Sequence, residues 1–186
     1  PEVVAKKQSK LSDVLRSAMQ AFENGDYDDA EQKCISIIKQ DPKQPEAYDI
    51  LSDVYIKQEQ FDEAEETLQF LLQIDPKRDT AMMKLAELHE KKGSPAAAIS
   101  WYEKAVLINP NISSRFAKMA ELLNHIGEHE TALEAIAQAS ELEPENPKYL
   151  DILTETSILC GKQEAAQEAF ERLRMANPEN AKLDFF

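Results

Sequence analysis

Cysteine and glycine are scarce in this chain of 186 residues, which contains two cysteines and four glycines. Cys34 and Cys160 are far apart and each falls inside an expected helix. Such isolated cysteines argue against a disulfide framework and favour a reducing compartment, so we expect a cytoplasmic location. So few glycines leave no glycine-rich loop of the kind that cradles phosphate groups.

Long apolar runs and an excess of basic residues are also missing. No run approaches the roughly 20 residues that a membrane-spanning helix needs. Lys and Arg total 21 against 35 Asp and Glu, which gives a net charge of −14. Nucleic acids and anionic membrane surfaces need a basic footprint on the protein. We therefore expect no nucleic-acid binding and no membrane insertion, and a basic or neutral protein partner fits this charge.

A period of 34 residues is the main feature that is present. Proline recurs in one frame, at Pro42, Pro76, Pro110, Pro144 and Pro178. A fixed period of this length is typical of an array of repeated supersecondary units. Five units fill the chain without a gap, over residues 11–44, 45–78, 79–112, 113–146 and 147–180.

Each unit carries the same pattern of small and apolar residues. Position 20 is always alanine, position 8 is always small, and position 15 is glycine in four units and Glu59 in the second. Small residues let two helices approach closely, and glycine suits a left-handed residue that ends a helix. Apolar spacings of three, four and seven are helical. We expect first helices over 12–24, 46–58, 80–92, 114–126 and 148–160, and second helices over 28–40, 62–74, 96–108, 130–142 and 164–176.

These positions resemble the tetratricopeptide repeat (TPR) family, whose pattern also asks for an aromatic residue at position 17. Tyr27 and Phe61 satisfy it, whereas Pro95, His129 and Gln163 depart from it. The resemblance covers residues 11–180 and implies an all-α fold, a right-handed α-solenoid or superhelix of antiparallel helix pairs. It also implies that the first helices line a concave groove that binds a peptide or a helix, and that the chain has no catalytic chemistry.

Two segments lie outside the five units. Residues 1–10 are interpreted as a linker or tether, because the chain opens with Pro1 rather than Met and looks like a piece of a longer protein. Residues 181–186 are interpreted as the start of a capping helix, since the last unit of a solenoid needs a cover for its apolar edge. Leu183, Phe185 and Phe186 would provide that cover.

The family's groove is lined by positions 2, 5, 9, 12 and 13 of each first helix. Position 9 holds Asp53, Glu87, Glu121 and Glu155, which predicts an acidic ladder. The expected partner-binding residues are Leu15, Met19, Phe22, Asp49, Asp53, Met83, Glu87, Glu121, Asp151, Glu155, Ile158 and Leu159. They favour a basic or amphipathic protein segment as partner. The alternative is that these acids only make the surface soluble, because acids are ordinary at this position in the family.

Two known kinds of TPR groove do not fit these columns. A clamp of basic residues and asparagine for a C-terminal carboxylate is excluded, because Asp49 and Asp53 would repel that group. A ladder of asparagines at position 6 is also absent. Position 6 holds Arg16, Ile50, Lys84, Lys118 and Ile152 instead.

Catalytic, cofactor and metal sites are not expected. His125 and His129 form the one cluster that resembles metal ligands, and Gly127 breaks the helix between them. No histidine is placed by the sequence to activate Cys160. Trp101 is the only tryptophan, and it is either a contact residue on the convex face or a packing residue.

The sequence therefore predicts a non-enzymatic scaffold for protein binding. Two alternatives stay open. One is a self-assembly module that associates as a homo-oligomer through the apolar ends of the solenoid. The other is a regulatory TPR domain of a larger signalling protein or enzyme.

Overall fold

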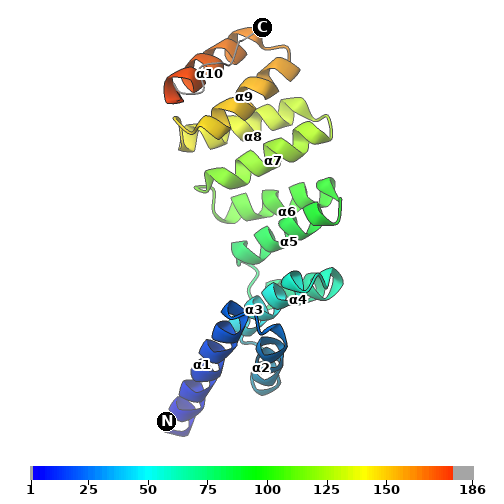
Figure 1. Ribbon diagram of the computed structural model, residues 1–186, viewed down its shortest axis with the longest axis vertical. Helices are drawn as coiled ribbons and strands as arrows, with labels where there is room; N and C mark the ends of the chain where they lie inside the picture. Colours follow the sequence, from blue (N-terminus) through cyan, green and yellow to red (C-terminus); the bar gives the residue numbers. More distant parts are fainter. Residues whose placement is uncertain (1, 178–186) are drawn as a thin grey trace. The chain divides into compact units, whose positions relative to one another are not determined.

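The computed structural model describes residues 2–177, and it describes side chains over 10–177. This part of the chain forms ten α-helices joined by short turns and contains no strand (Figure 1). The helices are α1 (Glu2–Glu23), α2 (Tyr27–Gln40), α3 (Pro45–Lys57), α4 (Phe61–Ile74), α5 (Asp79–Lys91), α6 (Pro95–Ile108), α7 (Ser113–His125), α8 (His129–Leu142), α9 (Pro147–Leu159) and α10 (Gln163–Ala176).

All ten predicted helices are present, and their ends agree with the prediction to within one residue except at the start of α1. This helix begins at Glu2 instead of residue 12. The segment before residue 12 contains no glycine or proline after Pro1, so nothing in its local sequence stops the helix. The role of residues 1–10 as a tether stays a prediction. The proposed cap at 181–186 lies outside the described residues.

The turn inside each helix pair closes with the same hydrogen bonds. After α1, Gly25 N–H donates to the Phe22 carbonyl at 3.0 Å and Asp26 N–H donates to the Ala21 carbonyl at 2.9 Å. This is the Schellman arrangement, and it needs a left-handed residue one place after the helix cap. Gly25 supplies it with φ +81°. The equivalent two bonds recur after α3, α5, α7 and α9.

Glu59 occupies this left-handed position in the second repeat, with φ 60°. A residue with a Cβ in this region costs roughly 1–2 kcal/mol. Glycine avoids that strain, but it loses more backbone entropy on folding, which offsets part of the gain. Glu59→Gly is therefore expected to raise the free energy of unfolding by about 0.5–1 kcal/mol, measured by urea denaturation.

The reverse substitution, Gly127→Ala, is the matched control because Gly127 has φ +86° and an added Cβ would meet no atom within 4 Å. Its cost is therefore conformational alone, and it should destabilise by a similar amount. A loss of stability in Glu59→Gly would show that the Glu59 side chain contributes more than its backbone strain costs.

Alanine at position 20 and small residues at position 8 let the helices of each pair approach closely. The position-20 alanines, Ala30, Ala64, Ala98, Ala132 and Ala166, all have 0% exposed surface. Position 24 supplies the large core side chains, namely Cys34, Leu68, Tyr102, Ile136 and Phe170, and all five are buried. Burial, together with the nearby charge of Glu31, raises the pKa of Cys34 to about 12, so this thiol is a packing residue.

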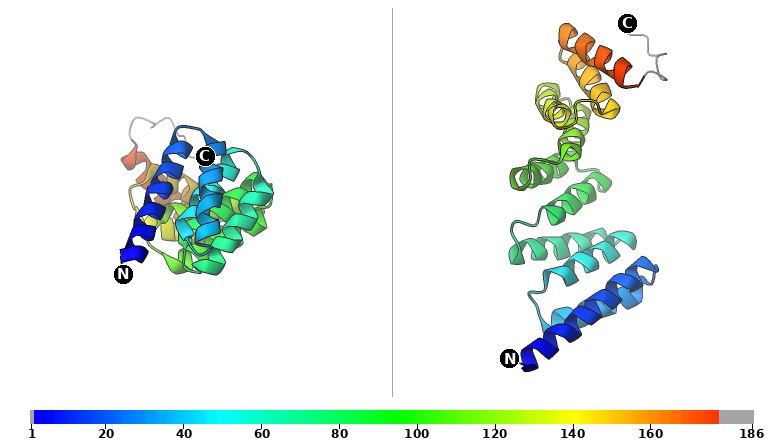
Figure 2. Two further views of the ribbon diagram at one scale, coloured as in Figure 1. Left: turned by 90° about the horizontal axis from the view of Figure 1, so that it is seen from below. Right: turned by 90° about the vertical axis from the view of Figure 1, so that its left-hand side faces the viewer.

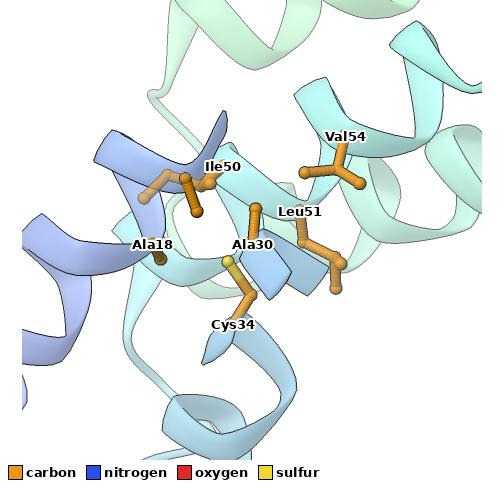
Figure 3. Packing of buried hydrophobic residues seen from close by; sticks show 7 residues of the cluster. Ala18, Ala30, Cys34, Ile50, Leu51 and Val54 are labelled. Atoms are coloured by element: carbon orange, nitrogen blue, oxygen red, sulfur yellow. The ribbon is translucent and has the colours of Figure 1, made fainter. Parts of the chain in front are cut away.

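The chain divides into two compact units, residues 1–88 and 89–186, with the division falling inside α5. In unit 1, α1 packs on α2 and α3, and α3 packs on α4. Figure 3 shows Ala18 of α1, Cys34 of α2 and Leu51 of α3 meeting in one buried cluster. In unit 2, α7 packs on α8 and α9, and α9 packs on α10; these helices run from light green to red in Figure 2. In both units, therefore, one first helix contacts the next.

Candidate functional site

The apolar residues predicted at the start of the groove lie on α1. Met19 has 46% of its surface exposed, whereas Leu15 and Phe22 are half-buried and pack against the cluster of Figure 3. The Phe22 ring also meets the Tyr27 ring, with centroids 5.7 Å apart. Of the three, Met19 is thus the side chain most available to a partner.

The acids of α3 are held in an ion-paired cluster within unit 1. Asp49 accepts a hydrogen bond from Arg78 Nε at 2.8 Å, and Lys84 Nζ lies 3.0 Å from its other carboxylate oxygen. The same Lys84 Nζ lies 2.7 Å from Asp53 Oδ1. The side chains of Asp49, Arg78 and Lys84 are only 19%, 24% and 22% exposed. This cluster therefore ties α3 to α5 and to the turn that precedes α5.

The remaining predicted residues of unit 1 are on α5. Met83 is half-buried, and Glu87 is exposed and has no ion pair among the described residues. Tyr55 of α3 adds a polar contact to α2, where its Oη donates to Glu31 Oε1 at 3.1 Å. Burial and this carboxylate raise the pKa of Tyr55 to about 12, so the phenol stays protonated at neutral pH.

Unit 2 repeats the ion-pairing pattern at Glu121 of α7. Lys148 Nζ, from the first turn of α9, lies 2.8 Å from Glu121 Oε1. Lys118 Nζ lies 3.6 Å from Glu121 Oε2 and 3.7 Å from Glu90 Oε2. Glu90 also accepts a hydrogen bond from the Tyr102 hydroxyl. The charge of Glu121 is therefore compensated locally.

One face of α9 is different, because its predicted residues are all exposed. Asp151, Glu155, Ile158 and Leu159 follow one another at helical spacings of four, three and one, and Ile158 and Leu159 have 57% and 48% of their surface exposed. Asp151 and Glu155 make no ion pair among the described residues. We call these four residues the α9 face. It combines two uncompensated carboxylates with two apolar side chains.

The sequence prediction missed the cations that pair with these acids. Lys84 and Lys118 occupy position 6, where the family's asparagine ladder is absent. A partial signal was available, since position 6 of one first helix can meet position 9 of the preceding one, although Lys118 pairs with Glu90 and Glu121 instead. Lys84 and Asp53 form such a pair. Arg78, in the turn between repeats, carries no such periodic signal.

The histidines that were considered as metal ligands lie on either side of the Gly127 turn. His129 Nδ1 is 3.2 Å from Asn124 Oδ1, and Asn124 Nδ2 donates to Thr156 Oγ1 at 2.7 Å. His129 thus belongs to a polar network that joins α7, α8 and α9. Over residues 10–177, no three His, Cys, Asp or Glu side chains gather in a way that could hold a metal ion.

Cys160 and Trp101 are the other two residues that the sequence singled out. Cys160 is half-buried, and burial, followed by the charge of Glu130, raises the pKa of its thiol, which disfavours the nucleophilic thiolate. Trp101 is half-buried on α6, and Lys104 Nζ lies 3.7 Å from its ring centroid in a cation–π contact.

None of the described helices has the combined length and apolar character that crossing a bilayer requires.

Tandem antiparallel helix pairs, with alanine at each close contact and a left-handed residue in each inner turn, define an all-α solenoid of repeats. Two family models, both described as tetratricopeptide repeat, match residues 21–71 and 51–111. The chain belongs to the tetratricopeptide repeat family. No curated protein is significantly similar to this sequence.

Solved structures of the same fold share little sequence with this chain. The crystal structure of a MamA protein gives a TM-score of 0.79 at 19% identity, over 95% of this chain and 96% of that chain. MamA from residue 41 to its end, from Desulfovibrio magneticus RS-1, gives 0.76 at 16% identity over 94% and 98%. YrrB, described as a TPR protein with an unusual peptide-binding site, gives 0.75 at 18% identity over 95% and 91%.

Proposed function

We propose that this chain is a non-enzymatic protein-interaction scaffold that binds a basic or amphipathic protein segment on the α9 face. The observation that carries the proposal is the exposure of Ile158 and Leu159 beside two uncompensated carboxylates on the same side of one helix. Exposed apolar side chains of this size gain free energy when a partner covers them. The flanking acids select a partner with basic residues.

The ion pairs explain why α9, rather than the whole acidic ladder, is assigned this role. Asp49 and Asp53 are engaged by Arg78 and Lys84, and a partner's cation would have to displace them. Asp151 and Glu155 are exposed and meet no such competitor. A segment with apolar residues spaced for one helical face and flanking lysines or arginines fits this surface. The peptide-binding site described for YrrB supports peptide recognition as a use of this fold.

A pair of synthetic peptides provides the test: an amphipathic helix built from Leu and Lys, and the same peptide with Glu in place of Lys. We expect the basic peptide to bind and the acidic one not to bind, because the α9 face is negative. Asp151→Lys combined with Glu155→Lys should weaken binding of the basic peptide by about tenfold or more. Fluorescence anisotropy at low and high salt measures this, and the effect should shrink as salt screens exposed charges.

Glu164→Lys combined with Glu168→Lys is the matched control, because these are exposed acids on α10 with the same spacing and the same change in charge. This control should leave the affinity nearly unchanged. An equal loss in both double variants would mean that the peptide responds to the net charge of the chain and would contradict a site on α9. Ile158→Ser combined with Leu159→Ser should weaken binding at every salt concentration, because it removes the apolar anchors.

A further inference from the structure

The last repeat exposes the positions that the next first helix covers in the other repeats. Positions 5 and 12 of the first helix and positions 17, 21 and 28 of the second helix are buried or half-buried in repeats 1–4. In repeat 5 all five positions are exposed, and no described helix follows α10 (Figure 1). Together with position 9, they form a surface that we call the terminal seam. It consists of Asp151, Glu155 and Ile158 of α9 and Gln163, Gln167 and Arg174 of α10.

Hydrogen bonds inside each unit show what covers these positions in the earlier repeats. In unit 1, Glu31 at position 21 of α2 accepts a hydrogen bond from Tyr55 of the following first helix at 3.1 Å. In unit 2, Asn124 at position 12 of α7 donates to Thr156 at position 10 of α9 at 2.7 Å. A first helix thus packs against both helices of the preceding repeat. The terminal seam therefore presents the kind of two-helix surface on which a further α-helix packs.

The incoming first helix also brings a lysine to the acids of the preceding one. Lys84, at position 6 of α5, lies 3.0 Å from Asp49 Oδ1 and 2.7 Å from Asp53 Oδ1. Lys148, at position 2 of α9, lies 2.8 Å from Glu121 Oε1. Asp49 is at position 5, and Asp53 and Glu121 are at position 9. Acids at these two positions are therefore compensated by a cation of the next first helix.

We propose that the terminal seam binds a basic amphipathic α-helix of a partner protein, in the place that the first helix of a sixth repeat would take. This inference rests on the proposed function, because it specifies how the α9 face recognises its partner. Asp151 and Glu155 hold positions 5 and 9 and make no ion pair among the described residues. A lysine or arginine of the partner helix therefore meets the same pair of carboxylates that Lys84 meets on α3, with no resident cation to displace.

The spacing of the partner's residues can be taken from α5. Lys84 at position 6 is followed four residues later by Leu88 at position 10, which is buried. Position 10 of one first helix meets position 12 of the preceding one, as the hydrogen bond between α7 and α9 shows. Position 12 of α9 is Ile158, which is 57% exposed. A helix with a lysine and, four residues later, a leucine therefore places the lysine at the two acids and the leucine on Ile158.

Two peptides test whether the bound segment is helical. The first is an alanine-based helix that carries Lys and, four residues later, Leu on one face. The second has proline in place of an alanine between them, which breaks the helix and keeps the charge and the leucine. With the full chain, fluorescence anisotropy should show at least about tenfold tighter binding of the helical peptide. Equal binding of both peptides would overturn the helical mode and leave the proposed function standing, whereas failure of both to bind would contradict the proposed function as well.

A charge exchange tests the position of the lysine. The helical peptide with Glu in place of its Lys should bind the natural chain at least about tenfold more weakly. Asp151→Lys combined with Glu155→Lys should restore the affinity for that peptide. Glu164→Lys combined with Glu168→Lys, the matched control on α10, should not restore it. Equal recovery in both double variants would mean that net charge alone decides the affinity, and it would overturn the assigned pairing.

The part of the terminal seam on α10 distinguishes a helix in the seam from a segment that lies on α9 alone. Gln167→Lys should weaken binding of the helical peptide by about fivefold or more, because it brings a like charge against the basic helix. Gln73→Lys is the matched control, since Gln73 is also exposed, lies on α4 in unit 1 and gives the same change in charge. Equal affinities of the two variants would overturn the contact with α10.

Two other occupants of the terminal seam would overturn its assignment to a partner protein. Sedimentation equilibrium of the full chain should show a monomer, and self-association that Asp151→Lys combined with Glu155→Lys abolishes would assign the seam to a second copy. Phe185→Ser combined with Phe186→Ser should leave the affinity for the helical peptide unchanged. A tenfold gain or more in that variant would mean that residues of this chain compete for the seam. Circular dichroism checks that every variant folds.

Discussion

Leu68→Ala is expected to lower the free energy of unfolding by about 2–5 kcal/mol, the range for a large-to-small change in a close-packed core. Leu68 lies at position 24 of α4 and has 0% of its surface exposed. Ala64, one turn earlier on the same side of α4, is equally buried and holds the neighbouring helix close. The surroundings therefore cannot collapse into the space, and the cavity adds to the lost burial.

Urea denaturation followed by far-ultraviolet circular dichroism measures the total loss. Stability in a repeat protein is roughly a sum of repeats and their interfaces, so amide hydrogen exchange should locate the loss in α3 and α4. Leu107→Ala is the control, since it is the same substitution at a residue that is 82% exposed. It should change stability by less than about 0.5 kcal/mol. Equal losses in the two variants would mean that position 24 is not a core position.

Asp49→Asn is expected to destabilise the protein by about 1–3 kcal/mol, because hydrogen bonds to charged partners contribute more than neutral ones. The carboxylate of Asp49 is shared by Arg78 and Lys84, whose side chains are 24% and 22% exposed. The substitution keeps the size of the side chain and removes its charge. Two partly buried cations would then lie close together with less compensation.

Asp151→Asn provides the comparison, because Asp151 occupies the same repeat position on α9 and is exposed. It should change stability by less than about 0.5 kcal/mol. The two variants should also differ in their response to salt, since partly buried pairs are screened much less than exposed ones. Similar small losses from both would show that the cluster at Asp49 contributes little to stability. The acids of α3 would then be available to a partner.

Helix positions were predictable because the signals for them are local. Alanine at position 20 and glycine at position 15 act through the backbone within a few residues, and all the helices except α1 therefore begin and end within one residue of the prediction. Glu59 shows the strength of this pattern, since it adopts the left-handed conformation without being glycine. The start of α1 differs from the prediction because the repeat sets the unit boundary at residue 11, whereas the helix continues back to Glu2.

The candidate site was predictable only in part. The repeat pattern identified which residues share the groove positions. It did not distinguish Asp49, which is ion-paired, from Asp151, which is exposed. The cations that make the difference come from elsewhere, Arg78 from a turn and Lys84 from the next first helix. The acidic ladder and the identity of the partner stay predictions that the peptide experiment tests.

The sequence by itself determined the family, the number of helices, the turns that join them and the small residues at each close contact. These follow from hydrogen bonds and steric limits that act over one or two helical turns and recur in every repeat. Only the tertiary structure decided which carboxylates are neutralised and which apolar side chains remain exposed. Charge pairing and burial depend on side chains that are about 30 residues apart in sequence and within a few ångströms in space. The reason is that electrostatic attraction and close packing depend on distance in space and not on sequence order.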